Sequence, residues 1–415
     1  MTASQELRQR ADTLAAAVGG GVAYAEYFAP NFRADVSEAA FRQLCAQLQT
    51  GYGKPTGIES LTPRTAHIAD FRLGFERGIA TGQIVVDPAA PHQVTGLLIT
   101  RTEPREAAEA SVEAVVAALK TLPGTTGFTL TKLDGDAPRT LAAHNATTPL
   151  AIGSAFKLVI LAELVRATNA GERRWDDVVT LDGTGLPGGG YTQKPAGTRV
   201  SLRELATQMI SVSDNSATDI LLRHLGREKV EAMLPVIGFR DAKGRNMPFL
   251  ATLEMFKLKG VQGGALGRRF EAADVAGRRA LLAGPVAKAP VSAIPAALFQ
   301  DRKPIRIATI EWFASPEDLV RTMDWLRRHS EGAQGAELRA ILSKNPGITA
   351  TAAARWGWIG YKGGSEPGVL NMTLLLQAKT GGWYALAASW NDPAAPIDEP
   401  RFAALVQKAA TLAAP

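Results

Sequence analysis

The chain has 415 residues, and this length favours two domains because single hydrophobic cores stop growing near about 250–300 residues. Its composition, 46% hydrophobic and 21% charged, is that of an ordinary globular protein. The net charge of +6 is scattered rather than gathered into a basic stripe with aromatic residues, which argues against a nucleic-acid partner. No uninterrupted apolar run is long enough to span a bilayer, so we expect no membrane span.

Cysteine, histidine and glycine patterns predict neither a metal nor a cofactor. The single cysteine, Cys45, excludes an internal disulfide, and its helical context favours a packed apolar role. The five histidines are isolated in the sequence and form no ligand pair. Gly183, Gly185 and Gly188 match a dinucleotide fingerprint, but more glycine and proline follow them instead of a helix, so we interpret this segment as a loop.

The N-terminus carries charged residues early and does not resemble a signal peptide. As written, the sequence is that of a cytoplasmic protein. If an export signal has been removed, the protein is periplasmic or secreted, so the compartment stays open.

The first hundred residues predict a small α+β domain, which we place at residues 1–103. Two helical patterns come first and three β-rich stretches follow; they cover residues 4–17, 37–50, 65–75, 82–86 and 93–100. The segment 102–107, with Pro104, is predicted to end the last strand and to begin a new helix. Asp70 and Arg72 share one face of a strand, but a scaffold role is favoured over a ligand site.

Residues 107–415 predict a second α+β domain in which early and late strands share one antiparallel sheet. In chain order we expect helices and strands over residues 107–122, 127–132, 139–144, 158–167, 201–210, 215–225, 356–361, 371–377, 382–389 and 398–413. Residues 240–306 mix glycine, alanine and basic side chains. We expect them to form an inserted cap over the functional site.

The first chemical motif is Ser154-Ala-Phe-Lys157. If Ser154 opens a helix, Lys157 lies one turn further on the same face, within reach of the hydroxyl. A serine hydroxyl needs a neighbouring base to become a nucleophile, and a lysine in a partly desolvated pocket can be neutral and serve as that base. Alone, the motif occurs by chance in about one of two such chains, so it carries little weight.

The second motif is Ser213-Asp214-Asn215, in a turn between two helical patterns. Ser213 can relay a proton between Lys157 and a leaving group, and the Asn215 amide can hold both the lysine and a substrate. The alternative is an ordinary helix N-cap, a role that Ser-Asp-Asn clusters fill routinely.

The third motif is Lys362-Gly363-Gly364, between Tyr361 and Ser365, at the end of a predicted strand. Lys362 supplies positive charge for a substrate carboxylate or a developing oxyanion. The two glycines let a substrate lie against the strand edge. The alternative is a glycine-rich turn with a surface lysine.

In this order the three motifs match the S-x-x-K, S-D-N and K-T-G set of class A β-lactamases and penicillin-binding proteins, and residues 107–415 resemble that superfamily throughout. A small N-terminal domain, a long insertion that contains residues 247–260, and the Lys-Gly-Gly motif are similar to the two-domain Cpe/LpqF group, which includes the β-lactamase-like protein of clavulanic-acid biosynthesis. The resemblance implies an N-terminal domain of the steroid-isomerase or cystatin type. It implies a second domain with a helix-flanked antiparallel sheet and an all-helical lobe.

The resemblance also implies a role for each motif residue. Ser154 would be the nucleophile, Lys157 the base, Ser213 the proton relay and Lys362 the third-motif cation. The substrate would contact Asn215, Tyr361, Gly363, Gly364 and Ser365. The backbone N–H groups of Ser154 and Ser365 would form the oxyanion hole.

Two departures from the family pattern bear on the substrate. Gly363 replaces the hydroxyl residue that binds the carboxylate of β-lactams. No match to the deacylating glutamate motif precedes the third motif; Glu311 is a candidate by position, with a structural ion pair as the favoured alternative.

The leading interpretation is therefore an esterase on small acyl or acetyl esters, like the cephalosporin esterases of the group, that works through an acyl-enzyme at Ser154. A β-lactamase or D-Ala-D-Ala peptidase is the second interpretation, and a non-hydrolytic acylated sensor or binding protein is the third. Rapid turnover of a chromogenic ester separates the first from the third. A stable penicillin adduct favours the third or a peptidase.

Overall fold

Residues 2–134, 137–240, 242–332 and 335–415 are described by the computed structural model. The chain divides into two units, one formed by Met1–Ala108 with Asp398–Lys408, and the other by Glu109–Ile397 with Ala409–Pro415. No helix among the described residues is both long and apolar enough to cross a membrane.

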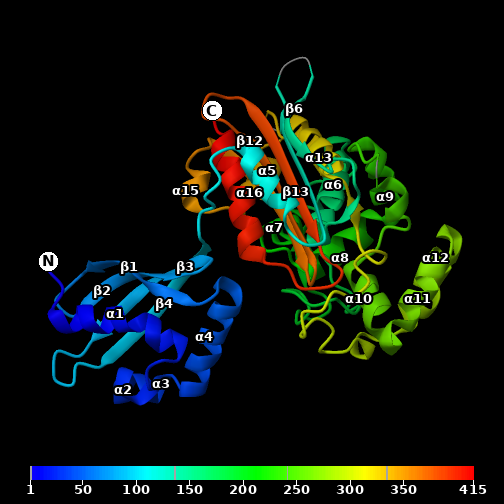
Figure 1. The fold of residues 1–415 in the computed structure, drawn as a ribbon. Helices are drawn as coiled ribbons and strands as arrows, with labels where there is room; N and C mark the ends of the chain where they lie inside the picture. Colours follow the sequence, from blue (N-terminus) through cyan, green and yellow to red (C-terminus); the bar gives the residue numbers. More distant parts are fainter. Residues whose placement is uncertain (1, 135–136, 241, 333–334) are drawn as a thin grey trace. The chain divides into compact units, whose positions relative to one another are not determined.

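The first unit combines helices with an antiparallel meander, labelled in Figure 1. Its elements are α1 (Gln5–Gly19), α2 (Tyr24–Tyr27), α3 (Pro30–Asp35), α4 (Glu38–Tyr52), β1 (Pro55–Pro63), β2 (Ile68–Phe75), β3 (Gly78–Val86) and β4 (Val94–Pro104). Alternate residues of β2, among them Phe71 and Leu73, are buried in a core that also contains Leu7, Leu14 and Cys45. This arrangement agrees with the expected α+β organisation.

The expected break at 102–107 is wrong in detail. Strand β4 continues through Pro104, and the backbone N–H of Arg105 still donates to the carbonyl of Arg77 at 2.9 Å. The next helix begins only at Val112, because the Ser111 hydroxyl accepts from the N–H of Ala114 and so caps it. Strand β1 is a further element that the sequence did not indicate.

The second unit is built on a five-stranded antiparallel sheet in the order β11-β12-β13-β5-β6 (Figure 1). Its strands are β5 (Thr125–Lys132), β6 (Arg139–His144), β11 (Trp358–Glu366), β12 (Val369–Gln377) and β13 (Trp383–Asn391). The early and late strands of this unit therefore share one sheet, as expected. The third motif lies inside β11 rather than at its end.

Helices surround this sheet and form a lobe beside it. They are α5 (Val112–Lys120), α6 (Lys157–Asn169), α7 (Leu202–Ser211), α8 (Asn215–Leu225), α9 (Arg227–Val236), α10 (Thr252–Gly260), α11 (Ala265–Ala272), α12 (Val275–Leu281), α13 (Pro316–His329), α14 (Ala336–Ser343) and α15 (Ala350–Ala353). The last helix, α16 (Glu399–Ala413), is divided between the units: its residues up to Lys408 belong to the first and the rest to the second. Short pairs of strands complete the unit: β7 (Leu150–Ala151) with β10 (Phe313–Ala314), and β8 (Val178–Thr180) with β9 (Arg199–Ser201).

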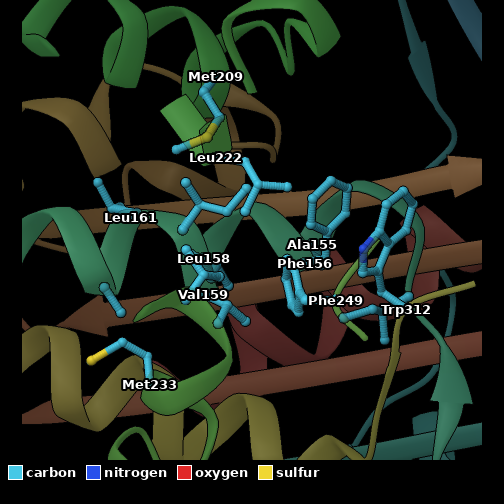
Figure 2. Packing of buried hydrophobic residues seen from close by; sticks show 14 of the residues in the cluster. Ala155, Phe156, Leu158, Val159, Leu161, Met209, Leu222, Met233, Phe249 and Trp312 are labelled. Atoms are coloured by element: carbon cyan, nitrogen blue, oxygen red, sulfur yellow. The ribbon is translucent and has the colours of Figure 1, made fainter. Parts of the chain in front are cut away.

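Helix α6 is the centre of the lobe because it is buried on nearly every face and most of its side chains are apolar (Figure 2). Leu158, Val159 and Leu161 are at most 1% exposed and pack among Met209, Leu222 and Met233 from neighbouring helices. A helix buried all round has little freedom to shift, so the residues at its first turn are held in fixed positions.

The 240–306 segment contains three helices, α10, α11 and α12, joined by short helical turns. Helix α10 is the one nearest to the three motifs, because Thr252, Met255 and Phe256 line a cavity together with Ser154. Of the expected cap over the functional site, α10 and Phe299 near the end of the segment line the cavity that contains Ser154.

Candidate active site

Ser154 lies in a short 3₁₀ turn, Gly153–Phe156, and α6 begins only at Lys157. Residues three apart in such a turn lie above one another, so the hydroxyl and the lysine share one side. Behind the turn, Phe156 stacks on Trp312 with 3.6 Å between ring centroids, and Phe249 packs edge-on against Phe156 (Figure 2). This aromatic packing holds the serine in place.

Lys157 is fully buried and directed at the second motif. Its ammonium donates to the Ser213 carbonyl at 2.6 Å, to the Ser213 hydroxyl at 3.1 Å and to the Asn215 side-chain oxygen at 2.7 Å. Each of the three N–H groups of the Lys157 ammonium thus has its own acceptor. A neutral Lys157 would keep two of these bonds and offer a lone pair to a hydroxyl proton.

Ser213 joins the two motif lysines. Lys362, which is 3% exposed, donates to the same Ser213 hydroxyl at 3.0 Å and to the Gly363 carbonyl at 2.5 Å. Ser213 has a φ of +60°, a conformation that non-glycine residues rarely adopt and that often marks functional sites. Asp214 caps α8 through the N–H of Ala217 at 2.7 Å, which holds the turn in this shape.

Burial changes the proton affinity of both lysines. Desolvation lowers the pKa of Lys157 to about 7, against the opposing charges of Asp219 and Asp214. Desolvation, helped by the charge of Lys157, also lowers the pKa of Lys362 well below its ordinary value. At neutral pH a substantial fraction of Lys157 is therefore neutral and able to accept a proton.

Strand β11 packs closely on the serine turn. A Cβ on Gly364 would lie 2.1 Å from the Ile152 carbonyl oxygen and 2.3 Å from the Ser154 nitrogen. A Cβ on Gly153, whose φ is +48°, would lie 3.0 Å from the Ser365 nitrogen. The backbone of the serine turn and the backbone of β11 at Gly364 and Ser365 therefore lie in close contact.

This contact makes Gly364→Ala a sharp test of the site. The new methyl group would collide with backbone atoms of the serine turn, so we expect any catalytic activity that depends on Ser154 to fall by about 10²-fold or more. Gly381→Ala, at another glycine of the same unit, is the control: it measures how much activity is lost when a glycine is replaced without a steric collision. Because Gly381 has a φ of +102° and open space around it, this variant tests backbone strain alone. An active Gly364→Ala enzyme would contradict the close approach.

The Tyr361 side chain packs against Gly363 and leaves no room for a side chain there. Tyr361 and Gly363 lie two residues apart on β11, and a Cβ on Gly363 would come within 2.1 Å of the Tyr361 hydroxyl oxygen. The Tyr361 ring also covers Gly347. Burial raises the pKa of Tyr361 to about 12, so its hydroxyl stays protonated. The tyrosine therefore fills the space where the family pattern places a hydroxyl side chain.

A cavity of about 230 Å³ opens beside Ser154, and we name it the Ser154 cavity. It is lined by Gly153, Ser154, Phe156, Asn215, Thr252, Met255, Phe256, Phe299, Glu311, Trp312, Ser365, Glu366 and Pro367. Three of the predicted site residues thus open onto one cavity: Ser154, Asn215 and Ser365.

Two members of a buried ion triad, Glu311 and Glu366, line the Ser154 cavity. Lys259 of α10 donates to Glu311 at 3.0 Å and to the two oxygens of Glu366 at 2.5 and 2.7 Å. Burial opposes the charge on Lys259, but the two carboxylates outweigh it and its pKa is raised. Burial and the charge of Glu311 raise the pKa of Glu366 well above its ordinary value. Glu311 is thus in the cavity wall, in an ion pair with Lys259.

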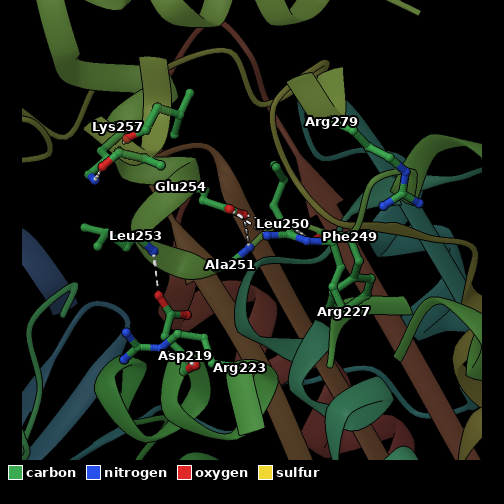
Figure 3. Close-up of polar contacts among 12 residues, drawn as sticks. Asp219, Arg223, Arg227, Phe249, Leu250, Ala251, Leu253, Glu254, Lys257 and Arg279 are labelled. Carbon is green, nitrogen blue, oxygen red and sulfur yellow. Dashed lines mark hydrogen bonds and ion pairs between the residues drawn. The ribbon is translucent and has the colours of Figure 1, made fainter. Parts of the chain in front are cut away.

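Asp219 ties the second motif to α10, as Figure 3 shows. Its carboxylate accepts from the N–H groups of Thr252 at 2.7 Å and Leu253 at 2.9 Å, while Glu254 of the same helix accepts from the N–H of Ala251 at 2.8 Å. Burial raises the pKa of Asp219 to about 6. Beside it, Arg227 forms a two-pronged ion pair with Glu254.

Sequence reasoning missed Lys259, Glu366 and Asp219. Asp219 follows Asn215 by four residues on α8 and so shares its helix face, a signal that was available. Glu366 directly follows Ser365. Lys259 carried no signal, because nothing in the sequence linked it to Glu311 or Glu366.

Comparison with known proteins decides the family. The model of the beta-lactamase enzyme family matches residues 107–414. The chain belongs to the beta-lactamase enzyme family. It is a serine hydrolase of the β-lactamase-like kind. None of the curated proteins matches the chain.

Solved structures similar to this β-lactamase-like chain include a β-lactamase from Sphaerobacter thermophilus, with 20% identity and a TM-score of 0.49 over 72% of this chain and 95% of that one. A structure of PBP-A has 16% identity and a TM-score of 0.48 over 72% and 93%. A β-lactamase from Chitinophaga pinensis has 16% identity and a TM-score of 0.48 over 72% and 96%. In the described part of the chain, no group of three or more His, Cys, Asp or Glu residues is placed to hold a metal ion.

Proposed function

We propose that this serine hydrolase is an esterase for small acyl or acetyl esters and belongs to the two-domain Cpe/LpqF group. The observation that carries the proposal is Gly363 itself: residue 363 has no hydroxyl side chain to bind a β-lactam carboxylate, and Tyr361 packs against it. An ester of a neutral acid does not need that contact. The N-terminal unit, of the steroid-isomerase or cystatin type in this proposal, serves as a scaffold.

In the proposed reaction, neutral Lys157 takes the proton of the Ser154 hydroxyl as its oxygen attacks the ester carbonyl. The N–H groups of Ser154 and Ser365 stabilise the resulting oxyanion. The proton then passes from Lys157 through the Ser213 hydroxyl to the leaving alkoxide, and the C–O bond of the alcohol breaks. Lys362, bonded to Ser213, keeps the relay hydroxyl oriented.

Deacylation needs a water in place of the departed alcohol, and the same relay can accept its proton in reverse. Glu311 remains a candidate for this step, but its ion pair with Lys259 favours a structural role. We therefore expect a bulky β-lactam adduct, which retains its leaving group and blocks the water, to be hydrolysed slowly. The second candidate, a β-lactamase or D-Ala-D-Ala peptidase, is supported by the description of the family.

The test is hydrolysis of 4-nitrophenyl acetate and of the chromogenic cephalosporin nitrocefin, together with intact-protein mass spectrometry. We expect ester turnover, slow nitrocefin opening and an acyl adduct on Ser154. Ser154→Ala should abolish both turnover and adduct, whereas Ser292→Ala, at an exposed serine of the insertion, should retain them. Fast nitrocefin opening would favour the β-lactamase alternative. A stable adduct without ester turnover would favour a sensor.

A further inference from the structure

The walls of the Ser154 cavity reveal which half of a substrate it receives. Asn215 and Ser365 line the cavity, but Ser213 and Lys362 do not. In the proposed reaction the proton for the leaving alcohol comes from Ser213, so the alcohol must face that hydroxyl. The acyl half then points the other way, into the Ser154 cavity.

The walls are apolar where the acyl chain would lie. Met255 and Phe256 come from α10, Phe299 from the end of the insertion, and Trp312 and Phe156 form the stacked pair behind the serine. Phe256 and Phe299 meet edge to face with 5.5 Å between centroids. Such a surface binds hydrocarbon through its removal from water.

The cavity offers no cationic partner for a charged acyl chain. Its lining residues, all of them in the described part of the chain, include no lysine or arginine. Its two carboxylates, Glu311 and Glu366, are already bound to Lys259. At about 30 Å³ for each water-sized group, 230 Å³ holds on the order of seven or eight non-hydrogen atoms.

We propose that the Ser154 cavity is an acyl-binding pocket that selects esters of uncharged, apolar acids of short to medium length, an inference that rests on the proposed esterase function. Acetyl esters would be substrates but would leave most of the pocket empty. The preferred acyl chain would be close to six carbons, and a chain of ten carbons would exceed the space.

The test is kcat/KM for the 4-nitrophenyl esters of acetic, butanoic, hexanoic and decanoic acids, and for the monoester of adipic acid, which has the hexanoate length and a terminal carboxylate. Each buried methylene is worth about 0.8 kcal/mol, so we expect about a fourfold rise per methylene up to hexanoate. Decanoate should be slower than hexanoate. The adipate monoester should be slower by at least about tenfold, because its charge has no cationic partner.

Variants tie the effect to the pocket. Phe299→Ala and Phe256→Ala should each lower the ratio of hexanoate to acetate kcat/KM by roughly tenfold. Phe299 is partly exposed, so its variant should fold. Val291→Ala, an exposed apolar residue of the same insertion that does not line the cavity, should keep the ratio. A ratio that these aromatic variants leave unchanged would overturn the proposal.

The same measurements test the esterase function and the acyl-binding pocket separately. If Ser154→Ala retains ester turnover, the proposed function is wrong. If turnover depends on Ser154 but kcat/KM falls from acetate to hexanoate, or adipate matches hexanoate, the acyl pocket is wrong while the esterase function stands.

Discussion

Replacing Lys157 with methionine is expected to lower kcat/KM for ester hydrolysis by about 10²–10⁴-fold, the usual contribution of a general base. The methionine fills similar volume and is apolar, so the buried position should tolerate it. Lys157→Arg should be as inactive, because a guanidinium keeps its proton. Lys120→Met, at an exposed lysine of α5, provides the matched control and should retain activity.

The pH profile distinguishes a base from a mere positive charge. Because burial lowers the pKa of Lys157 to about 7, kcat/KM should rise with pH through about 7 as the lysine loses its proton, then level off. If Lys157 acted as a fixed cation, activity would fall over that range instead. Residual activity of Lys157→Met should lack the rising limb, and a limb that persists would assign it to another group.

Lys259→Met is expected to destabilise the fold by about 3–5 kcal/mol, because it leaves two buried carboxylates beside each other without their counter-charge. Urea unfolding followed by tryptophan fluorescence would measure this loss. The triple variant Lys259→Met, Glu311→Gln, Glu366→Gln should recover a large part of it, since no buried charge remains. If Lys259→Met alone costs under about 1 kcal/mol, the triad does not hold these elements together.

The deficit of Lys259→Met should also depend on pH. The folded-state pKa of Glu366 is already raised by burial and by Glu311, and losing Lys259 raises it further. A carboxyl whose folded pKa is raised is most favourable for folding below its unfolded pKa, and this benefit is lost as pH rises through the folded pKa. The variant should therefore be closest to the parent protein in acid and weakest near neutral pH. A surface pair such as Lys303 with Asp301 should show no comparable effect when Lys303 is replaced by methionine.

The sequence predicted the elements whose patterns are long and whose motifs are local. Helix α8 and strands β12 and β13 lie close to their expected bounds, because hydrophobic periodicity reports burial on one or both faces, whereas β11 continues to Glu366, past its expected end at Tyr361. The three motifs could be ordered into one site by resemblance, and the structure brings Lys157, Ser213 and Lys362 into one hydrogen-bonded group.

What sequence could not supply were contacts between distant segments. Lys259 lies in the insertion, Glu311 just before the short strand β10 and Glu366 at the end of β11. No periodicity in the sequence links these three residues, although they form one ion triad. Tyr361 over Gly363 was equally invisible, since only side-chain direction along β11 shows that one residue fills the space of the other. Helix α5 begins at Val112 because Ser111 caps it. The start expected from the sequence is too early, because Pro104 is a residue type typical of a first helical turn.

Asp219 has a consequence for how this enzyme can change. One carboxylate holds the first turn of α10, which forms a wall of the Ser154 cavity, and the same charge favours the protonated form of Lys157. Asp219 therefore affects both the cavity wall that selects the acyl group and the pKa of Lys157. A substitution that reshapes the start of α10 to admit a new acyl group will also shift the pH at which the enzyme begins to work, so adaptation to a new ester is coupled to adaptation to a new acidity.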